Sequence, residues 1–199
     1  MTMTDLVKKF KNHVTELSNN SKDFIHHEWF VKYHLEIVEK IALELCAVYK
    51  NADKDLVILM VWLHDYGKII DFTNEHSMTL TAGKDKLLEL GFSQDISDKA
   101  INYIELLDKK ESLESDSTPI EIKIVSSADG AAHLVGPFFH LWWYENPKQP
   151  FQQLIKDNIQ KSTIDWEKKI VLPEIKKAFE QRHNFLLEQA GNFPEKFLL

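Results

Sequence analysis

The sequence has few of the residues on which turn-rich or disulfide-linked folds depend. Its 199 residues include only six glycines, six prolines and one cysteine, Cys46. So few turn-forming residues argue against an all-β fold, which needs a turn between most pairs of strands. A single cysteine cannot form a disulfide bond within the chain, and this is typical of proteins from a reducing compartment.

Long apolar runs and an excess of basic residues are also absent. No run approaches the ~18 apolar residues of a membrane span, and the first residues lack the apolar segment of a signal peptide. We therefore expect a cytoplasmic protein with no membrane partner. Lys and Arg total 24 against 31 Asp and Glu, a net charge of −7, so we expect no broad nucleic-acid surface. A small anionic substrate remains possible, and the oligomeric state is left open.

Apolar residues instead recur at helical spacing along most of the chain. With 44% hydrophobic and 28% charged residues, the composition is that of a globular protein. We expect one all-α domain over residues 1–199, a bundle of about seven to nine helices. The expected helices cover residues 4–18, 23–50, 54–66, 76–90, 95–109, 119–135, 149–162 and 163–190.

Glycine and proline suggest where several helices end or bend. Gly67 is expected to end the helix over 54–66 in a left-handed conformation, with a loop over 69–75. Gly91 is expected to close the helix over 76–90, and Pro173 to kink the last helix.

Two other segments are also informative. The polar residues 110–118 are expected to form a surface loop. The β-branched residues of 120–125 are compatible with a strand, but no partner strand is predicted, so a helix beginning near Pro119 is favoured.

The most unusual stretch begins inside the helix expected over 54–66 and continues just past its end. Eight consecutive apolar residues, 56–63, are followed at once by His64 and Asp65, and then by Gly67 and Lys68. An apolar run this dense is expected to be buried. Burying a histidine and a carboxylate at its end is costly unless they are paired or bound to a metal ion.

Other buried helix faces carry further groups that can bind a metal. His34 lies on the apolar face of the helix over 23–50, and Asp129 lies among apolar residues of the helix over 119–135. Together with His64 and Asp65 they make a mixed nitrogen and oxygen set. Such a set suits one divalent ion, which we expect to be Mn, Fe, Ni, Co, Zn or Mg. The alternative is a buried hydrogen-bonded network without metal.

This pattern resembles that of the HD-domain metal-dependent phosphohydrolases. The likeness rests on His34, on residues 63–68 (Leu-His-Asp-Tyr-Gly-Lys) and on Asp129 after Ala128. It covers an HD-type core over 25–135 and leaves 136–199 as a C-terminal helical extension. The resemblance implies an all-α bundle of the HD-domain type, with His34, His64, Asp65 and Asp129 as ligands of a divalent metal ion. It also implies hydrolysis of a phosphate ester or anhydride.

Three further residues near the motif are candidates for the site. Lys68 could hold a phosphate as a point charge or simply complement a helix dipole. His76 could assist proton transfer or bind phosphate, or it could lie on the surface. His133, one turn after Asp129, could line the substrate pocket or orient Asp129. We therefore assign Asp65, Lys68 and His76 as candidate catalytic residues, and Lys68 and His133 as candidate substrate-binding residues.

The number of metal ions is also predicted. Some members of the family bind two metals through additional histidines between the His-Asp doublet and the last aspartate. The helix over 95–109 instead offers Asn102, Glu105 and Asp108, so we expect one ion.

The expected function is hydrolysis of a small phosphorylated molecule, such as a nucleotide, by metal-activated water. The alternative is a ligand-binding or regulatory module that keeps the metal site without catalysis. The aromatic segment 138–144 could line the pocket as a wall for a planar group, or it could pack in the core.

Overall fold

The computed structural model describes residues 2–109, 113–191, 193–196 and 198. Its regular elements are all helices, with no β-strand in these ranges, so the predicted all-α fold is confirmed. None of the helices found there is both long and apolar enough to cross a membrane. In chain order the elements are α1 (Met3–Asn20), a π-helical turn η1 (Val31–Leu35), α2 (Glu36–Val48), α3 (Lys54–Leu63), α4 (Tyr66–Ile70), a 3-10 turn η2 (Phe72–Asn74), α5 (Glu75–Leu90), α6 (Gln94–Asp108), α7 (Ile120–Ala132), α8 (Phe138–Glu145), α9 (Phe151–Ile164), a second π-helical turn η3 (Asp165–Lys169) and α10 (Pro173–Gln189).

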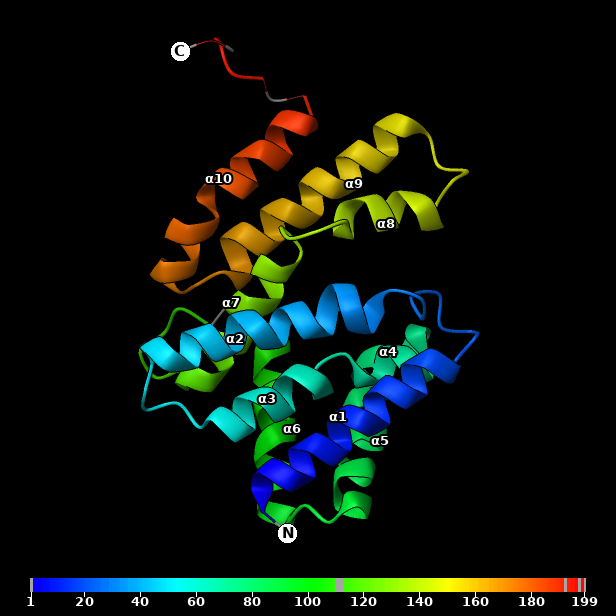
Figure 1. Cartoon of the computed structure of the whole chain (residues 1–199), viewed down its shortest axis with the longest axis vertical. Coiled ribbons are helices and arrows are strands. Elements are labelled where there is room, and N and C mark those ends of the chain that lie inside the picture. The colour runs from blue at the N-terminus through cyan, green and yellow to red at the C-terminus, as the bar shows by residue number, and fades with distance from the viewer. Residues whose placement is uncertain (1, 110–112, 192, 197, 199) are drawn as a thin grey trace.

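The helices form two groups that meet at α2 and α7. Figure 1 shows α8, α9 and α10 together at one end of the molecule and α1, α3, α5 and α6 towards the other. Helix α3 packs against α1, α2, α6 and α7. Seven of its ten residues are buried, as expected for a helix that other helices surround. The apolar run of 56–63 is therefore the centre of the core.

Several helix ends follow the local rules that the sequence suggests. Asp53 accepts a hydrogen bond from the backbone of Leu56 at the start of α3, and Ser93 does the same for Ile96 at the start of α6. Gly91, with φ of 99°, ends α5 in the left-handed region. The helix expected over 119–135 is also present, as α7. Part of the loop expected over 110–118 lies outside the described residues.

The prediction for Gly67 was wrong. Helix α3 already ends at Leu63, and α4 begins at Tyr66, so Gly67 is helical and the expected loop over 69–75 is largely helical too. Glycine is required there because α4 packs directly on α5. A Cβ atom at Gly67 would lie 1.9 Å from the carbonyl oxygen of Glu75 and 2.6 Å from the backbone nitrogen of Thr79. The close approach also lets the Gly67 N–H donate to Thr79 Oγ1 at 2.9 Å.

Two other boundaries differ from expectation. Residues 22–29 form turns, so the helix expected over 23–50 begins only at Phe30 and passes through η1 before α2. Pro173 does not kink a helix; it stands in the first turn of α10, where its missing N–H costs no hydrogen bond. The chain between α9 and α10 instead passes through η3, which continues α9 by one wide turn.

Replacing Gly67 by alanine should lower the free energy of unfolding by about 1–3 kcal/mol or more, because the new methyl group meets backbone atoms that cannot move alone. Urea denaturation measures this loss. Gly83→Ala is the matched control within α5, since its new Cβ would meet mainly the side-chain end of Leu63. A Gly67→Ala protein as stable as the Gly83→Ala protein would contradict the tight α4–α5 contact.

Candidate metal centre

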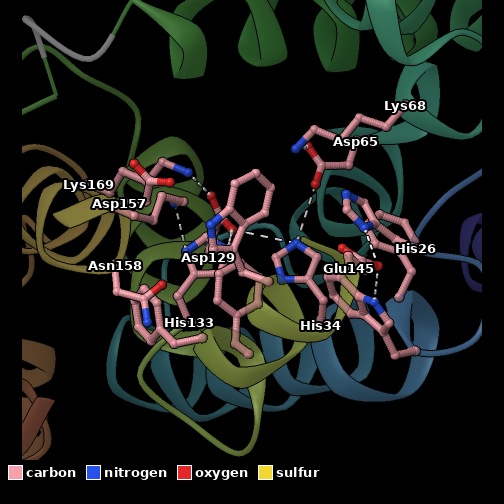
Figure 2. Close-up of a pocket in the computed structure, with 16 residues that line it drawn as sticks. His26, His34, Asp65, Lys68, Asp129, His133, Glu145, Asp157, Asn158 and Lys169 are labelled. Carbon is pink, nitrogen blue, oxygen red and sulfur yellow. Dashed lines mark hydrogen bonds and ion pairs between the residues drawn. The ribbon is translucent and has the colours of Figure 1, made fainter. Parts of the chain in front are cut away.

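Four side chains predicted as metal ligands converge at the junction of the two helix groups. His34 comes from η1, His64 and Asp65 from the turn after α3, and Asp129 from α7. His34 and Asp129 are buried and His64 and Asp65 nearly so, with at most 12% of each side chain exposed. Figure 2 shows Asp65 and Asp129 on either side of His34, each joined to it by a dashed line.

The ligand atoms of these residues face one another. His34 Nε2 lies 3.4 Å from Asp65 Oδ2 and 3.6 Å from Asp129 Oδ1. His64 Nε2 lies 3.5 Å and 3.8 Å from the same two oxygens. These distances exceed the ~2.7–3.2 Å of a good N–H···O hydrogen bond. They are close to the roughly 3.0–3.5 Å that separates atoms bound to one ion at about 2.1 Å.

His64 provides a direct test of whether a metal ion fits. Its Nδ1 lies 2.7 Å from the carbonyl oxygen of Val61, so Nδ1 carries the hydrogen of the neutral ring and Nε2 carries the lone pair. This Nε2 is buried and finds no hydrogen-bond partner in the described part of the chain. A buried lone pair that faces two carboxylates fits a cation between them. The residues therefore could hold a divalent metal ion.

The electrostatics favour ionised carboxylates at this place. Burial works against the charge of Asp65, but His64 and Lys68 outweigh it and hold the pKa well below its usual range. Burial likewise opposes the charge of Asp129, and Lys169 and His133 outweigh it, so that pKa is also well below its usual range. Both carboxylates are therefore anionic at neutral pH, as metal ligands must be.

The two histidines respond differently to this environment. Burial lowers the pKa of His34, which keeps its ring neutral and able to bind a metal. Burial also disfavours the charged form of His64, but Asp65 and Asp129 outweigh it and raise that pKa. The site thus attracts positive charge to the space between the carboxylates.

Lys68 lies at the site, as the sequence indicates. Its Nζ donates to Asp65 Oδ1 at 2.9 Å, on the oxygen that is not directed at the histidines. Its side chain is 29% exposed and borders the adjoining cavity. An ammonium group has three N–H donors, so this lysine can hold Asp65 and still donate to a bound anion.

His133 is also brought into the cluster. Its Nε2 lies 3.5 Å from Asp129 Oδ1, and its ring stacks on that of His34 with centroids 5.1 Å apart. Burial, reinforced by the charge of Lys161, lowers the pKa of His133 to about 4. The ring is therefore neutral at pH 7. Its position makes a second possible ligand group with His34 and Asp129.

Three residues of the C-terminal segment complete the cluster, and sequence reasoning missed them. Asp165 is fully buried and lies 2.8 Å from His133 Nδ1 and 2.6 Å from Lys161 Nζ. Lys169 donates to Asp129 Oδ2. A carboxylate bonded to the far nitrogen of a histidine is the usual outer partner of a metal-binding imidazole. Lys161, Asp165 and Lys169 are four residues apart along the sequence, and this spacing was a signal. The same spacing is equally typical of exposed ion pairs on a helix.

Both π-helical turns lie at this centre. In η1 the Glu36 N–H bonds the Val31 carbonyl, and in η3 the Ile170 N–H bonds the Asp165 carbonyl, each five residues back. The extra residue in such a turn changes which side chains face the core, and π-turns are frequent at functional sites. Here η1 places His34 at the metal centre, and η3 places Asp165 and Lys169 beside it.

His76 and the polar residues of α6 lie elsewhere. His76 Nδ1 is 2.6 Å from Asp108 Oδ2, and both side chains are about half exposed. Glu105 pairs with Lys109 at 3.1 Å, and Asn102 is exposed. The structure therefore does not bring His76 to the site, and α6 provides none of the groups at the metal centre.

A cavity of about 290 Å³ adjoins the metal centre. His34, Asp65 and Asp129 border it from one side, and an aromatic wall faces them. That wall includes Phe138, Phe139 and Trp142 of α8 together with Trp29 and Phe30. The segment 138–144 therefore lines the pocket with one helix face, while Phe139 is also buried.

Comparisons of this chain with protein-family models, with curated proteins and with solved structures find no match. The resemblance to the HD-domain phosphohydrolases therefore continues to rest on the motif residues alone.

Replacing Asp165 by asparagine should lower the free energy of unfolding at pH 7 by about 2–4 kcal/mol, because His133 and Lys161 lose a buried anion. Burial alone would raise the pKa of Asp165, but His133 and Lys161 lower it from 3.8 to about 2. The stabilisation is therefore complete above about pH 4 and is lost as the pH falls towards about 2.

Urea denaturation of wild type and variant across this pH range tests the prediction, and the two curves should approach each other in acid. Asp157→Asn is the control, because it removes a carboxylate that borders the cavity but bonds Gln153 on the exposed side of α9. Equal losses for the two variants would contradict the role of Asp165.

Proposed function

We propose that this chain is a metal-dependent phosphohydrolase of the HD type that acts on a small phosphorylated molecule. One observation carries the proposal: each of two imidazole nitrogens lies 3.4–3.8 Å from each of two carboxylate oxygens, beside a cavity of small-molecule size. Such a donor set with space next to it is typical of catalytic rather than purely structural metal sites.

The ligands of the ion would be His34, His64, Asp65 and Asp129, with His133 in reach. A divalent ion such as Mn, Fe, Ni, Co, Zn or Mg supplies two things when bound there: a water of lowered pKa and polarisation of a phosphoryl oxygen. Asp165 would hold His133 in the orientation that directs Nε2 at the centre.

A single ion is supported by Lys169. Its ammonium group bonds Asp129 Oδ2, the oxygen that faces away from His34 and His64. A second metal ion bridged by Asp129 would need that oxygen. The lysine therefore supplies the second cation of the site as part of the chain.

Substrate binding is assigned to Lys68 and to the cavity walls. Lys68 pairs with Asp65 at 2.9 Å and lies 3.9 Å from Glu75. It also borders the cavity, and its ammonium group has three N–H donors, so it can contact a phosphate oxygen near the metal centre. The aromatic side chains of the wall exclude water from the organic part of the substrate. Shielding from water strengthens the electrostatic contacts at the phosphate.

The second candidate function is a ligand-binding or regulatory module that keeps the metal site without catalysis. One observation favours it: the three lysines that border this cavity are already engaged. Lys68 is bonded to Asp65, Lys161 to Asp165 and Lys169 to Asp129. Little positive charge is left to compensate a phosphate in its transition state.

Alanine in place of His64 or Asp65 should lower both metal affinity and the hydrolysis of phosphate esters, each by at least the roughly 10–100-fold that loss of an outer partner of a ligand costs. Elemental analysis measures metal per chain, and a panel of nucleotides and generic phosphate esters with several divalent ions measures hydrolysis. His76→Ala is the matched control, because this exposed histidine lies away from the cluster. It should keep both metal and activity.

The outcomes separate the two functions. Hydrolysis that survives loss of the metal would exclude the phosphohydrolase proposal. Metal bound by the wild type, with no hydrolysis across the panel and a small molecule that co-purifies, would favour the binding module. Absence of bound metal in every protein would contradict both.

A further inference from the structure

Glu145 borders the cavity and has a buried carboxylate oxygen without a hydrogen-bond partner among the residues that the structure describes. The residue stands at the end of α8, and only 5% of its side chain is exposed. Its Oε1 accepts hydrogen bonds from Trp29 Nε1 at 2.6 Å and from the ring nitrogen of His26 at 2.9 Å. Its Oε2 is buried and has no hydrogen-bond partner among the residues that the structure describes.

The position of Glu145 is distinct from the metal centre. Figure 2 shows it beside His26, on the side of the pocket opposite Asp157 and Asn158. Neither Glu145 nor His26 belongs to the groups that could hold a metal ion. The pair instead borders the aromatic part of the cavity.

The free oxygen indicates what kind of group would bind there. A carboxylate oxygen only accepts hydrogen bonds, and leaving it buried without a donor is costly. Trp29 and His26 both donate to Oε1, so within the described ranges no protein group compensates the burial of Oε2. A ligand that brings an N–H donor would meet it, and a charged donor would do so most strongly.

The surrounding rings favour a cation over a neutral donor. Trp29 and Phe138 meet edge to face with centroids 5.9 Å apart, and both border the cavity with Trp142. Aromatic faces attract an ammonium group through their quadrupole, an effect that grows where water is excluded. A buried carboxylate among aromatic rings is thus suited to an alkylammonium group.

Helix α8 sets the distance between this place and the metal centre. Phe138, at the first turn, packs on His133 with centroids 4.0 Å apart. Glu145 follows seven residues later, about two turns or roughly 10 Å along the helix axis. A molecule that lies along this face of α8 would have one end at the metal centre and the other at Glu145.

We propose that the substrate is a phosphate monoester whose organic part ends in a primary amine, with Glu145 as the acceptor for its ammonium group. The phosphate end of this inference rests on the proposed function, whereas the amine end rests on Glu145 and the aromatic wall. Glu145 is therefore assigned as a residue that determines specificity.

The test uses a series of ω-aminoalkyl phosphates, from aminoethyl to aminohexyl phosphate, and matched alkyl phosphates that end in methyl. Calorimetry with the metal-loaded full chain measures their affinities. The wild type should bind the best aminoalkyl phosphate about 10–100-fold more tightly than its methyl-ended match, as expected for a charge-assisted hydrogen bond.

Glu145→Gln is the informative variant. Its amide oxygen can still accept from Trp29 and His26, while its NH₂ group replaces the free oxygen with a donor. The preference for the amine should fall to within about twofold, and the melting temperature should not decrease. Asp157→Asn is the matched control, because it removes one charge from the same cavity at the other side and should keep the preference.

Each outcome decides the inference. An equal loss of preference in both variants would show a general charge effect and overturn it, as would a wild type without preference or without binding. If hydroxyalkyl phosphates bind as tightly as the aminoalkyl phosphates, a neutral donor is sufficient at Glu145, and this result would also overturn the inference. An amine preference that depends on Glu145, without any hydrolysis, would support the inference while the proposed function fails.

Discussion

The structure depends on the burial of one negative charge, that of Asp129 in the last turn of α7. A buried carboxylate must be compensated, and here the compensating groups come from several directions. His34 and His64 approach Oδ1 from the N-terminal half of the chain, His133 approaches it from the residue that follows α7, and Lys169 bonds the other oxygen from η3. The two groups of helices in Figure 1 are therefore joined by electrostatic contacts as well as by apolar packing.

This arrangement gives the C-terminal segment a part in the site. The candidate site crosses the predicted boundary between a core over 25–135 and an extension over 136–199. Asp165 and Lys169 lie behind the metal centre, and α8 provides one wall of the cavity. The wall of the cavity is thus shared between the segment that carries the motif, which provides Trp29 and Phe30, and the C-terminal segment.

The sequence predicted those features that depend on local chemistry. A His-Asp doublet at the end of an apolar run, with His34 and Asp129 on other apolar faces, was sufficient to identify four side chains that the structure brings together. Helical periodicity likewise predicted the all-α fold. Such patterns can be recognised in the sequence because a buried polar residue stands among apolar residues at helical spacing.

Features that depend on contacts between distant segments were not readable. Gly67 resembled a helix end, but its role is set by the backbone of α5 against which it packs. Lys161 and Asp165 have the spacing of an exposed ion pair, and only the fold shows that the carboxylate is fully buried. Glu145 is joined to Trp29 across 116 positions of sequence, a pairing that no local pattern reveals.

The two π-helical turns also limit how the length of the chain can vary. Each contains one residue more than a regular turn would hold, and an α-helix advances about 100° around its axis per residue. Loss of a single residue from η3 would leave the segment helical and its composition nearly unchanged. It would nevertheless rotate Asp165 relative to Lys169, so both could not keep their partners. Relatives of this chain that share its chemistry should therefore tolerate substitutions in these turns more readily than insertions or deletions.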